Sequence, residues 1–490
     1  MTTELLIGHR AADARIAVRA GEPISAGRFV ADAQALARQL PPAQYVLNSC
    51  RDRYLFAVGF CAAMIAGRTS LLPPSRTPET LAQLAMRYPD TLYLGDDAGQ
   101  IVWRTAAASA KWQADESAPS WPPPAFAREN VAAIAFTSGS TGEPQAQPKT
   151  WGGIVDGARA ETIALQLADA PPAMSLGPQA RRVQPQRSGA NTLNDAVLVG
   201  TVSPQHMYGF ESTVLMALHG PCAFAAEHPL HPDEVVAVLS RISGRRVLIT
   251  APVHLRALAE SAHSMPALDR VVSATAPLTL ELAQKCETKW GTRVFEVYGC
   301  TETGMVATRR TVDGARWTTM RDVKIEDRDG HFHAHGGHVQ PGRLADRLRL
   351  ISDSTFELDG RADDVVNIGG KRASLEGLNR VLLSIDGVLD GAIFEPPATP
   401  DLTREQRLMA LVVAPEITRA ELLAALRAQI DAAFLPRPLV WVDALPRNAQ
   451  GKLPKAELLA LARKALQASA ARQPKSKGTV AQPSDIRVDS

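Results

Sequence analysis

The sequence predicts an α/β fold: a large N-terminal domain of mostly parallel sheets wrapped by helices, with a small mobile α+β domain at the C-terminal end. Three observations lead to this prediction. A chain of 490 residues is too long for one hydrophobic core. Short apolar runs at 44–47 and 69–72 flank a helical stretch at 54–67, and this β-α-β alternation is typical of a parallel sheet. A charged segment with paired glycines at 356–371 then precedes a second, shorter series of strands and helices.

The bulk composition is that of an ordinary soluble protein. Hydrophobic residues make up 45% and charged residues 21% of the chain, and the net charge is +2. No basic block precedes the tail, so the composition gives no support to nucleic-acid binding. The five cysteines are scattered without a C-x-x-C pair, which fits a reduced cytosol and argues against a disulfide framework or a cysteine-based zinc site. We therefore expect a cytoplasmic protein.

No membrane segment is expected. Charged residues interrupt the N-terminal stretch, unlike a signal peptide, namely Glu4, Arg10, Asp13 and Arg15. The longest uncharged apolar run, at 54–67, is shorter than the ~20 residues that a membrane span needs. A buried helix is the better interpretation of that run.

The chain up to residue 273 continues the alternation of helices and strands. A helical pattern at 31–40 precedes the first strand, and a loop rich in Ser and Pro at 117–124 leads to an apolar strand at 131–135. Further predicted elements are a helix at 151–167 and strands at 197–202, 247–250 and 271–273. The stretch 170–191 collects Pro, Gly, Gln and Arg without periodicity and is predicted to be a mobile surface insertion.

A loop of small hydroxyl residues follows the strand at 131–135. It consists of Thr137, Ser138, Gly139, Ser140, Thr141 and Gly142, and Pro144 ends it. Such a loop can turn backbone N–H groups inward and let a polyanion approach without Cβ clashes, while the hydroxyls add donors for phosphate oxygens. It has no Gly-Lys-Ser/Thr, G-x-G-x-x-G or G-x-S-x-G pattern. The loop indicates phosphate binding of another type, although a plain Ser/Thr/Gly turn would also explain it.

A second motif lies at 294–304, where a strand-like run ends in Tyr-Gly-Cys-Thr-Glu-Thr-Gly. Together with the hydroxyl loop before it, this motif resembles the adenylate-forming enzymes: acyl- and aryl-CoA synthetases, luciferases and peptide-synthetase adenylation domains. The resemblance covers roughly residues 45–465 and implies an ATP site. It implies that Tyr298 stacks on adenine, that Thr301 bonds phosphate, and that Glu302 holds the Mg²⁺ bridging the phosphates, as suits a hard cation.

The same resemblance assigns two further segments. The turn Pro-Gln-His-Met-Tyr-Gly at 204–209 resembles the segment that lines the acid pocket, although a lone histidine there is also common as a structural residue. The pocket residues that the resemblance implies are His206, Gly209, Ser273 and Gly304. A small-residue loop follows the strand at 271–273 and resembles the loop on which adenine lies, although an ordinary turn would explain it too. Its residues are Thr275, Ala276 and Pro277.

The C-terminal part carries the remaining motifs. Residues 1–361 are predicted to form the adenylation core that binds ATP and acid, 362–468 a lid, and 469–490 a disordered tail. Asp346 lies fifteen residues before Arg361, which resembles the family's ribose-binding aspartate and its partner arginine. By the same resemblance Asp363 is the hinge residue, Arg372 belongs to the nucleotide site, and Lys452 is the catalytic lysine of a Pro-Arg-x-x-x-Gly-Lys loop. Within the lid we predict strands at 388–394, 410–413 and 440–442, a helix opened by the capping box of Thr418 and Glu421, and a last helix to about 468.

One position departs from the family pattern. The family often has Pro-Lys-Gly after the phosphate loop, whereas Pro144 is followed here by Gln145, and Lys149 comes four residues later. Two interpretations stay open. Either Lys149 contacts the pyrophosphate in place of the missing lysine, or the loop relies on its backbone and hydroxyls.

Four of the eleven histidines fall within ten residues. They are His331, His333, His335 and His338. Alternate positions on a strand would align three imidazoles on one face, a geometry that a metal could use. Because no cysteine or partner cluster accompanies them, we predict a solvated strand that binds no metal.

The resemblance implies a reaction in two steps. A carboxylic acid attacks the α-phosphorus of MgATP, pyrophosphate leaves, and a thiol of CoA or of acyl-carrier phosphopantetheine then displaces AMP after the lid has rotated. The histidine turn and Gln145 look most like the ligases of bacterial aryl-polyene-type pathways, so we expect an aryl or medium-length acyl acid and possibly an acyl-carrier protein as partner. The alternatives are a catalytically silent nucleotide- or acyl-binding relative and a luciferase-like oxygenase on the same fold.

Overall fold

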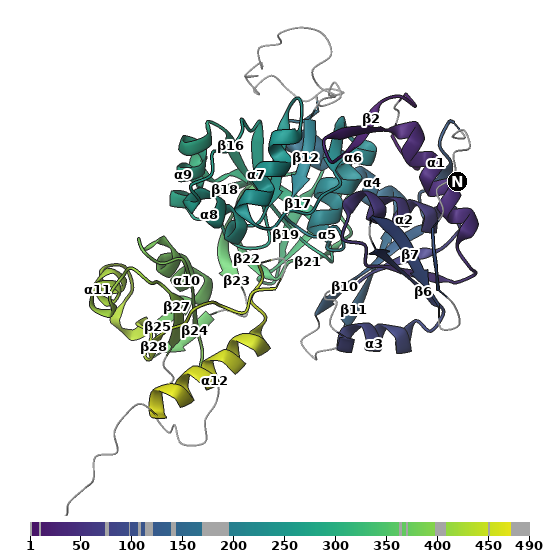
Figure 1. Ribbon diagram of the computed structural model, residues 1–490. Helices are drawn as coiled ribbons and strands as arrows, with labels where there is room; N and C mark the ends of the chain where they lie inside the picture. The colour runs from purple at the N-terminus through teal and green to yellow at the C-terminus, as the bar shows by residue number, and fades with distance from the viewer. Residues whose placement is uncertain are drawn as a thin grey trace, which may run out of the picture. The chain divides into compact units, whose positions relative to one another are not determined.

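The computed structural model describes residues 2–8, 11–73, 78–97, 99–105, 109–112, 121–138, 144–168, 196–361, 365–368, 371–396, 408–448 and 451–471. The chain forms two compact units, one of Met1–Val366 with Ala449–Lys452 and one of Asn367–Asn448 with Leu453–Ser490. The division after residue 366 falls five residues beyond the predicted boundary at 361. Gly451 and Lys452 group with the larger unit rather than with the predicted lid, and Figure 1 shows the course of the described elements.

The first sheet of the larger unit has, within the described residues, the strand order β11-β10-β5-β4-β6-β7-β8. Strands β10, β5, β4 and β6 are parallel neighbours, as the alternating pattern predicts. Strand β11 folds back antiparallel on β10, so Thr137 pairs with Gln145 and Ala133 pairs with Lys149. In that order the strands are β11 (Pro144–Thr150), β10 (Val131–Ser138), β5 (Thr69–Leu72), β4 (Tyr45–Asn48), β6 (Thr91–Asp97), β7 (Gln100–Arg104) and β8 (Ser109–Lys111).

Three helices accompany this sheet. Helix α2 (Arg53–Ile65) matches the predicted buried helix, and it is buried along nearly all its length because its sequence is apolar on every face. Asp52 caps it by accepting from the Leu55 N–H. Helix α1 (Ala26–Gln39) begins earlier than predicted because Ser25 acts as its N-cap, accepting from the Arg28 N–H. The third helix is α3 (Pro78–Arg87).

The second sheet has, among the described residues, the order β22-β23-β18-β17-β16-β15-β14-β12-β13-β2-β3. Its parallel strands end at one edge, where the loops after them collect. The loops after β12, β15 and β16 carry the motifs predicted to bind acid and nucleotide. The strands are β22 (Asp346–Ser352), β23 (Thr355–Arg361), β18 (Arg316–Thr319), β17 (Gly304–Arg310), β16 (Arg293–Cys300), β15 (Arg270–Ser273), β14 (Arg246–Thr250), β12 (Ala196–Gly200), β13 (Cys222–Ala225), β2 (Arg15–Arg19) and β3 (Glu22–Ser25).

Helices lie on this sheet and close the core. Helices α7, α8 and α9 (Figure 1) share one hydrophobic core cluster with strands β12, β13, β14, β15 and β16. These helices are α7 (Pro232–Arg241), α8 (Pro252–Glu260) and α9 (Leu280–Trp290). A second group packs into the core shared with the first sheet: α4 (Trp151–Ala164), α5 (Met207–Gly209), the π-helix η2 (Phe210–Leu215) and α6 (Met216–His219). Helix α4 confirms the helix predicted after the phosphate-loop hairpin.

Short elements complete the larger unit. An antiparallel sheet joins β19 (Lys324–Arg328), β20 (His331–His335) and β21 (Gly342–Arg343). Strand β1 (Thr3–Leu5) pairs with β9 (Ala125–Ala127), and the 3₁₀ helix η3 (Thr311–Asp313) follows β17.

The smaller unit has its own apolar core on β26 and β27. Thr418 and Glu421 form the predicted capping box at the start of α11. From this capping box the sequence predicts a helix as far as Phe434, but α11 ends at Gln429. Strand β24 spans the division between the two units. In chain order the elements are β24 (Val365–Ile368), β25 (Lys371–Ser374), α10 (Leu375–Ser384), β26 (Asp390–Phe394), β27 (Met409–Val413), α11 (Arg419–Gln429), η4 (Ala432–Phe434), β28 (Leu439–Trp441) and α12 (Lys455–Ala471).

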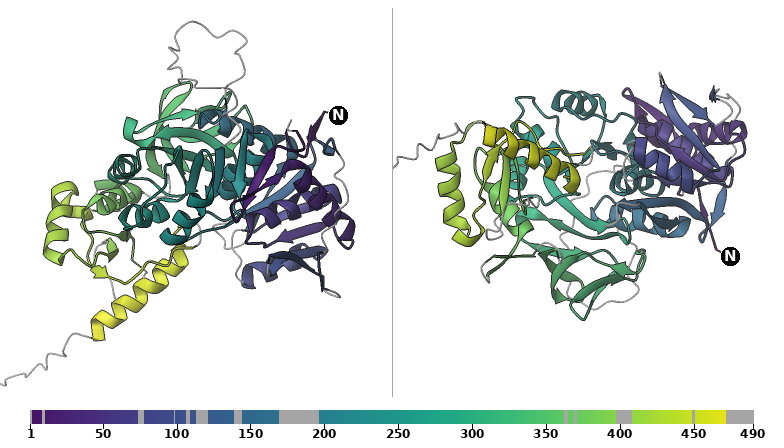
Figure 2. Two further views of the ribbon diagram at one scale, coloured as in Figure 1. Left: turned by 45° about the horizontal axis from the view of Figure 1, so that its top comes forward. Right: turned by 90° about the horizontal axis from the view of Figure 1, so that it is seen from below.

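Some predictions concern residues at the ends of the described ranges or outside them. Helix α12, the yellow helix of Figure 2, runs to Ala471 and so enters the predicted disordered tail at 469. The insertion at 170–191, the hinge residue Asp363 and the rest of the tail lie outside the described residues.

Candidate active site

A pocket in the larger unit brings three predicted motifs together. Phe136 lies at the end of β10, just before the hydroxyl loop, and it lines the pocket with His206 and Thr301. The other lining residues are Leu72, Pro73, Ala135, Gln205 and Met207. The side chains of Thr137 and Ser138 and the whole stretch 139–142 lie outside the described part of the chain. The strand that feeds the predicted phosphate loop, the histidine turn and the Thr-Glu turn thus meet at one place.

The histidine turn depends on a close backbone contact. A Cβ atom at Gly209 would lie 2.0 Å from the carbonyl oxygen of Ser203, so only glycine fits there. His206 occupies the N-cap position of α5 and lines the pocket, whereas Gly209 is buried behind it. Ser273, at the end of β15, is fully buried, and its hydroxyl has no hydrogen-bond partner within the described residues. The geometry therefore gives Gly209 a packing role and leaves His206 as the pocket residue of this turn.

The predicted nucleotide residues Tyr298, Asp346 and Arg361 come together across three strands. The Tyr298 hydroxyl donates to the Asp346 carboxylate over 2.7 Å. The fifteen-residue spacing between Asp346 and Arg361 becomes a direct pairing in the β22–β23 hairpin. The Tyr298 ring packs edge-on against Phe356, with ring centroids 5.7 Å apart. Of Arg361 and Arg372 the structure describes the backbone and not the side chains.

The loop predicted to lie against adenine has an unusual backbone. Thr275 adopts φ +79°, a conformation that is rare for a β-branched residue. Ala276 and Pro277 follow, and the Leu278 N–H then donates to the buried Glu296 carboxylate over 3.1 Å. Strained positions of this kind cost about 1–3 kcal/mol and cluster at functional sites. The strain at Thr275 supports a functional loop rather than an ordinary turn.

Lys149 points into the protein, where it meets the Thr-Glu turn. Its ammonium donates to the main-chain carbonyl of Glu302 over 3.0 Å and to the Gln340 Oε1 over 2.7 Å. Only 4% of Lys149 is exposed, and burial lowers the pKa of its ammonium against the opposing effect of Glu211. The sequence left open whether Lys149 contacts pyrophosphate directly, and such a contact stays a prediction.

A buried carboxylate lies beside Lys149. Glu211, on η2, lines a cavity of about 20 Å³ together with Lys149, Gly304 and His338, which is room for about one water molecule. Burial raises the pKa of Glu211 to about 7, with Lys149 opposing the rise. The Glu211 Oε2 has no hydrogen-bond partner among the described residues. Gly304, predicted for the acid pocket, therefore lies at this polar cavity.

Glu161, on α4, is a second buried carboxylate in this region. It accepts from the Ser212 hydroxyl over 2.5 Å. Burial raises its pKa to about 8; the Ser212 hydrogen bond opposes the rise and the nearby Glu211 adds to it. Sequence reasoning missed both carboxylates. For Glu211 the available signal was that it is an acidic residue inside the apolar run at 207–218.

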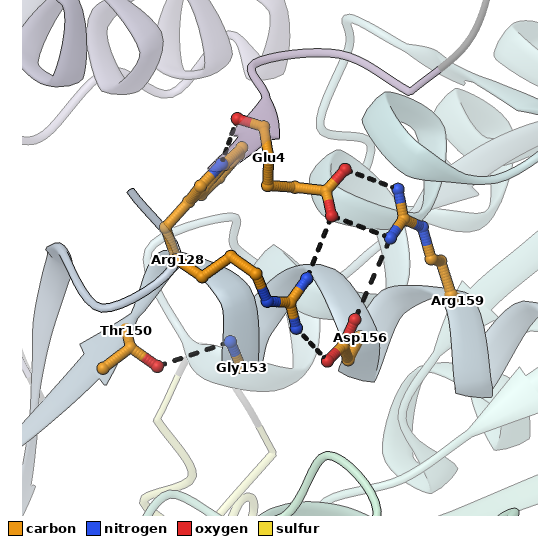
Figure 3. A network of polar contacts seen from close by, with 7 residues as sticks. Glu4, Arg128, Thr150, Gly153, Asp156 and Arg159 are labelled. Atoms are coloured by element: carbon orange, nitrogen blue, oxygen red, sulfur yellow. Dashed lines mark hydrogen bonds and ion pairs between the residues drawn. The ribbon is translucent and has the colours of Figure 1, made fainter. Parts of the chain in front are cut away.

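Helix α4 is held in place by an ion-pair network (Figure 3). Arg159 donates to Glu4 over 2.7 and 3.0 Å, and Arg128 joins Glu4 at 3.0 Å and also Asp156. Thr150 caps the helix by accepting from the Gly153 N–H over 3.3 Å. Burial tends to raise the pKa of Glu4, but the Arg159 hydrogen bond and the surrounding arginines outweigh it and lower that pKa. The network fixes the helix that begins two residues after Lys149.

The predicted catalytic lysine belongs to the larger unit. Gly451 adopts φ +74°, and a Cβ atom there would lie 2.7 Å from the Val253 Cγ1 at the start of α8. Lys452 follows it with an exposed side chain. In the smaller unit, Arg447 from the same loop motif makes a two-point ion pair with Asp390 at 2.6 and 2.7 Å. Sequence reasoning did not identify this pair.

The histidine run does not converge on one point. His335 faces Glu326 at 2.9 Å, whereas His338 leaves the strand and meets the Met305 carbonyl at 2.7 Å. Burial lowers the pKa of His338. The described residues hold no group of three or more metal-binding side chains. That these histidines bind no metal stays a prediction.

Two further findings concern the described residues only. All five cysteines are free thiols, and four of them are buried. In the part of the chain that the structure describes, none of the helices is both long and apolar enough to cross a membrane.

The parallel α/β sheets and the meeting of three motifs at one pocket fit the predicted class of adenylate-forming enzymes. Residues 38–331 match the family described as AMP-binding enzyme, and the chain belongs to this family. A 4-coumarate–CoA ligase of Halorhodospira halophila is 27% identical over 356 residues, which cover 67% of this chain and 77% of that protein. A 4-coumarate–CoA ligase of Rhodobacter capsulatus is 28% identical over 328 residues, covering 66% of this chain and 75% of that protein.

A solved structure shares the fold over nearly the whole chain. O-succinylbenzoate coenzyme A synthetase from Bacillus subtilis, in complex with AMP, superposes with a TM-score of 0.71 at 16% identity, covering 93% of this chain and 98% of that one. The predicted class and fold are confirmed. The chain is an adenylate-forming ligase, which activates a carboxylic acid as an acyl-adenylate at the expense of ATP and converts it to a thioester.

Proposed function

We propose that this ligase activates an aryl or medium-length acyl acid and passes it to the thiol of CoA or of an acyl-carrier phosphopantetheine. The names of the two 4-coumarate–CoA ligases support an aryl acid and CoA. The histidine turn and Gln145, which resemble the aryl-polyene-type ligases, favour a carrier protein as the final acceptor.

The pocket shared by Phe136, His206 and Thr301 carries this proposal. An acid whose carboxylate lies there would meet the α-phosphate at the mouth of the loop formed by residues 137–142. His206 would orient the carboxylate, and Thr301 would donate to phosphate. Charge builds up on the α-phosphate oxygens during the attack, so donors and cations that are already in position lower the barrier.

The nucleotide is assigned to the residues around Tyr298. The ring would stack on adenine against the loop at 275–277, and Asp346 with Arg361 would bind the ribose hydroxyls. Arg372 is assigned to the same nucleotide. Lys452, whose residue groups with the larger unit in this structure, would approach the α-phosphate for the first step; its loop would have to leave that unit and move with the lid when the lid turns at Asp363 for the second. These roles stay proposals until variants are measured.

Glu302 is the residue that would hold Mg²⁺. It is half-buried and directly follows Thr301, which lines the pocket. Since the described residues offer no cluster of three metal-binding side chains, they fit an ion that takes one carboxylate and completes its shell with water and substrate phosphates, as Mg²⁺ does. The ion would supply positive charge at the phosphates.

Pyrophosphate exchange tests the proposal. The enzyme, labelled pyrophosphate, ATP and one acid are mixed, with benzoates, cinnamates and fatty acids compared in parallel. Acid-dependent label in ATP identifies the substrate, and CoA or a carrier protein is then added to follow thioester formation. The absence of exchange with every acid would favour the silent relative, and oxygen consumption would favour the luciferase-like alternative.

A further inference from the structure

One ammonium group joins three parts of the chain beside the Thr-Glu turn. Lys149, on β11, donates to the Glu302 carbonyl at 3.0 Å and to the Gln340 Oε1 at 2.7 Å. Gln340 is fixed in turn, because its Nε2 donates to the Pro148 carbonyl at 2.7 Å and its N–H donates to the Thr303 carbonyl at 3.2 Å. The Thr-Glu turn is therefore tied to the hairpin that carries the phosphate loop.

The location of Lys149 separates it from the phosphate loop itself. It pairs with Ala133 in the β10–β11 register, whereas Thr137, where the loop begins, pairs with Gln145. Four residues along a strand correspond to about 13 Å. The ammonium donates its hydrogen bonds to the Glu302 carbonyl and to Gln340, and only 4% of Lys149 is exposed to solvent.

A buried ammonium is costly unless it is paired and hydrogen-bonded. Around Lys149 that compensation comes from the two hydrogen bonds, and the ionised fraction of Glu211 across the cavity adds to it. Any movement of the Thr-Glu turn would break the bond to the Glu302 carbonyl and leave the charge less compensated. The arrangement resists such movement.

We propose that Lys149 is a positioning residue for the magnesium site: by holding the main-chain carbonyl of Glu302, it fixes the direction of the Glu302 carboxylate. The inference rests on the proposed role of Glu302 as the Mg²⁺ ligand. In this proposal Lys149, which lies four residues after the usual lysine position, orients Glu302 and does not contact pyrophosphate. Partners that orient metal ligands typically contribute about 10–100-fold to metal affinity.

The test uses an ATP analogue in which a methylene group replaces the oxygen between the α- and β-phosphates, so that adenylation cannot proceed. Its binding to the full chain is measured by titration calorimetry without any acid, once with Mg²⁺ and once with EDTA. For Lys149→Met we expect about tenfold weaker binding with Mg²⁺ and unchanged binding in EDTA. An equal loss in both conditions would mean that Lys149 contacts the phosphates directly, and no loss would mean that it positions nothing; either result overturns the proposal.

Two further variants control for folding. Lys289 also donates to two main-chain carbonyls, those of Ala259 and Ser261 at 2.8 and 2.9 Å, but on α9, so Lys289→Met should bind the analogue like the wild type. Gln340→Leu removes the other partner of Lys149 and should weaken Mg²⁺-dependent binding by roughly threefold. If Lys149→Met shows no cooperative melting, Gln340→Leu decides: an unchanged affinity in Mg²⁺ contradicts the proposal. A wild-type chain that does not bind the analogue with Mg²⁺ would instead contradict the proposed function.

Discussion

The Tyr298 hydroxyl donates a hydrogen bond to the Asp346 carboxylate across 2.7 Å. Tyr298 lies near the end of the strand that leads into the Thr-Glu turn, and Asp346 begins a hairpin in which it lies opposite Arg361. The residue proposed for adenine and the residue proposed for ribose are thereby held at a fixed distance from each other. This contact makes their separate contributions testable.

Tyr298→Phe should raise the apparent KM for ATP. The ring remains, but Asp346 loses a hydrogen bond of the charged type, which contributes about 1.5–3 kcal/mol, so a rise of about tenfold is expected while the KM for the acid is unchanged. Steady-state kinetics at saturating acid measure it. The matched change Tyr45→Phe, on β4 and packed on Tyr88, should leave both constants unchanged. A rise in the KM for acid alone would contradict the nucleotide assignment.

Lys452→Ala should separate the two steps. Removing a charge-stabilising group typically costs about 10²–10³ in rate, and this loss should fall on adenylation, measured by pyrophosphate release. Thiol attack on a supplied acyl-adenylate should stay within roughly tenfold of the wild type, because nothing specific to that transition state was removed.

Lys455→Ala is the control for Lys452→Ala, since both side chains are exposed and carry the same charge three residues apart. Its rates should match the wild type in both steps. Equal losses in both steps for Lys452→Ala would argue that this lysine only maintains the structure, and intact adenylation would show that the assignment is wrong.

Glu161→Gln should change how stability depends on pH. Burial raises the pKa of this carboxyl to about 8 in the folded state, from the value of 4.5 that an exposed glutamate has. A raised pKa means that the stabilising contribution is complete below pH 4.5 and is lost as the pH rises toward 8. Glutamine imitates the protonated form, so the unfolding free energy of the variant relative to the wild type should rise by a few kcal/mol between pH 5 and pH 8. Urea unfolding at four pH values measures this, and parallel profiles would contradict it.

The histidine run should bind no structural metal. His335 and His338 face different partners, Glu326 and the Met305 carbonyl, so a common ligand sphere would require β20 and the following turn to rearrange. Protein purified without a tag should contain no stoichiometric zinc or nickel by mass spectrometry. Stoichiometric metal that disappears in a His333→Ala, His335→Ala variant would overturn this prediction.

Much of the fold was predictable because the signals are local. The apolar run at 131–135 and the buried helix at 54–67 form the predicted elements, since hydrophobic period and length decide them. The partnership of Asp346 with Arg361 was expected from the family resemblance, and the structure pairs the two residues directly in the β22–β23 hairpin.

The rest depends on contacts between distant segments. The sequence shows that Lys149 follows the phosphate loop, but the partner of its ammonium, Gln340, is 191 residues away. Strand alternation decides that Lys149 faces inward, and a single shift in the β10–β11 register would have turned it to the solvent. The carboxylate of Glu211 was missed because its burial depends on the tertiary packing of the helix around it.

Through the ion pairs of Glu4, the first few residues of the chain help to hold helix α4 in place. Arg128 and Arg159 both depend on this one carboxylate, and the Trp151 indole N–H donates to the Glu4 carbonyl at 3.2 Å. A protein engineer who trims the chain to begin at residue 6, or fuses a bulky partner directly to it, would therefore disturb α4 and the hairpin before it. Any display or immobilisation of this ligase is better attached through the opposite terminus.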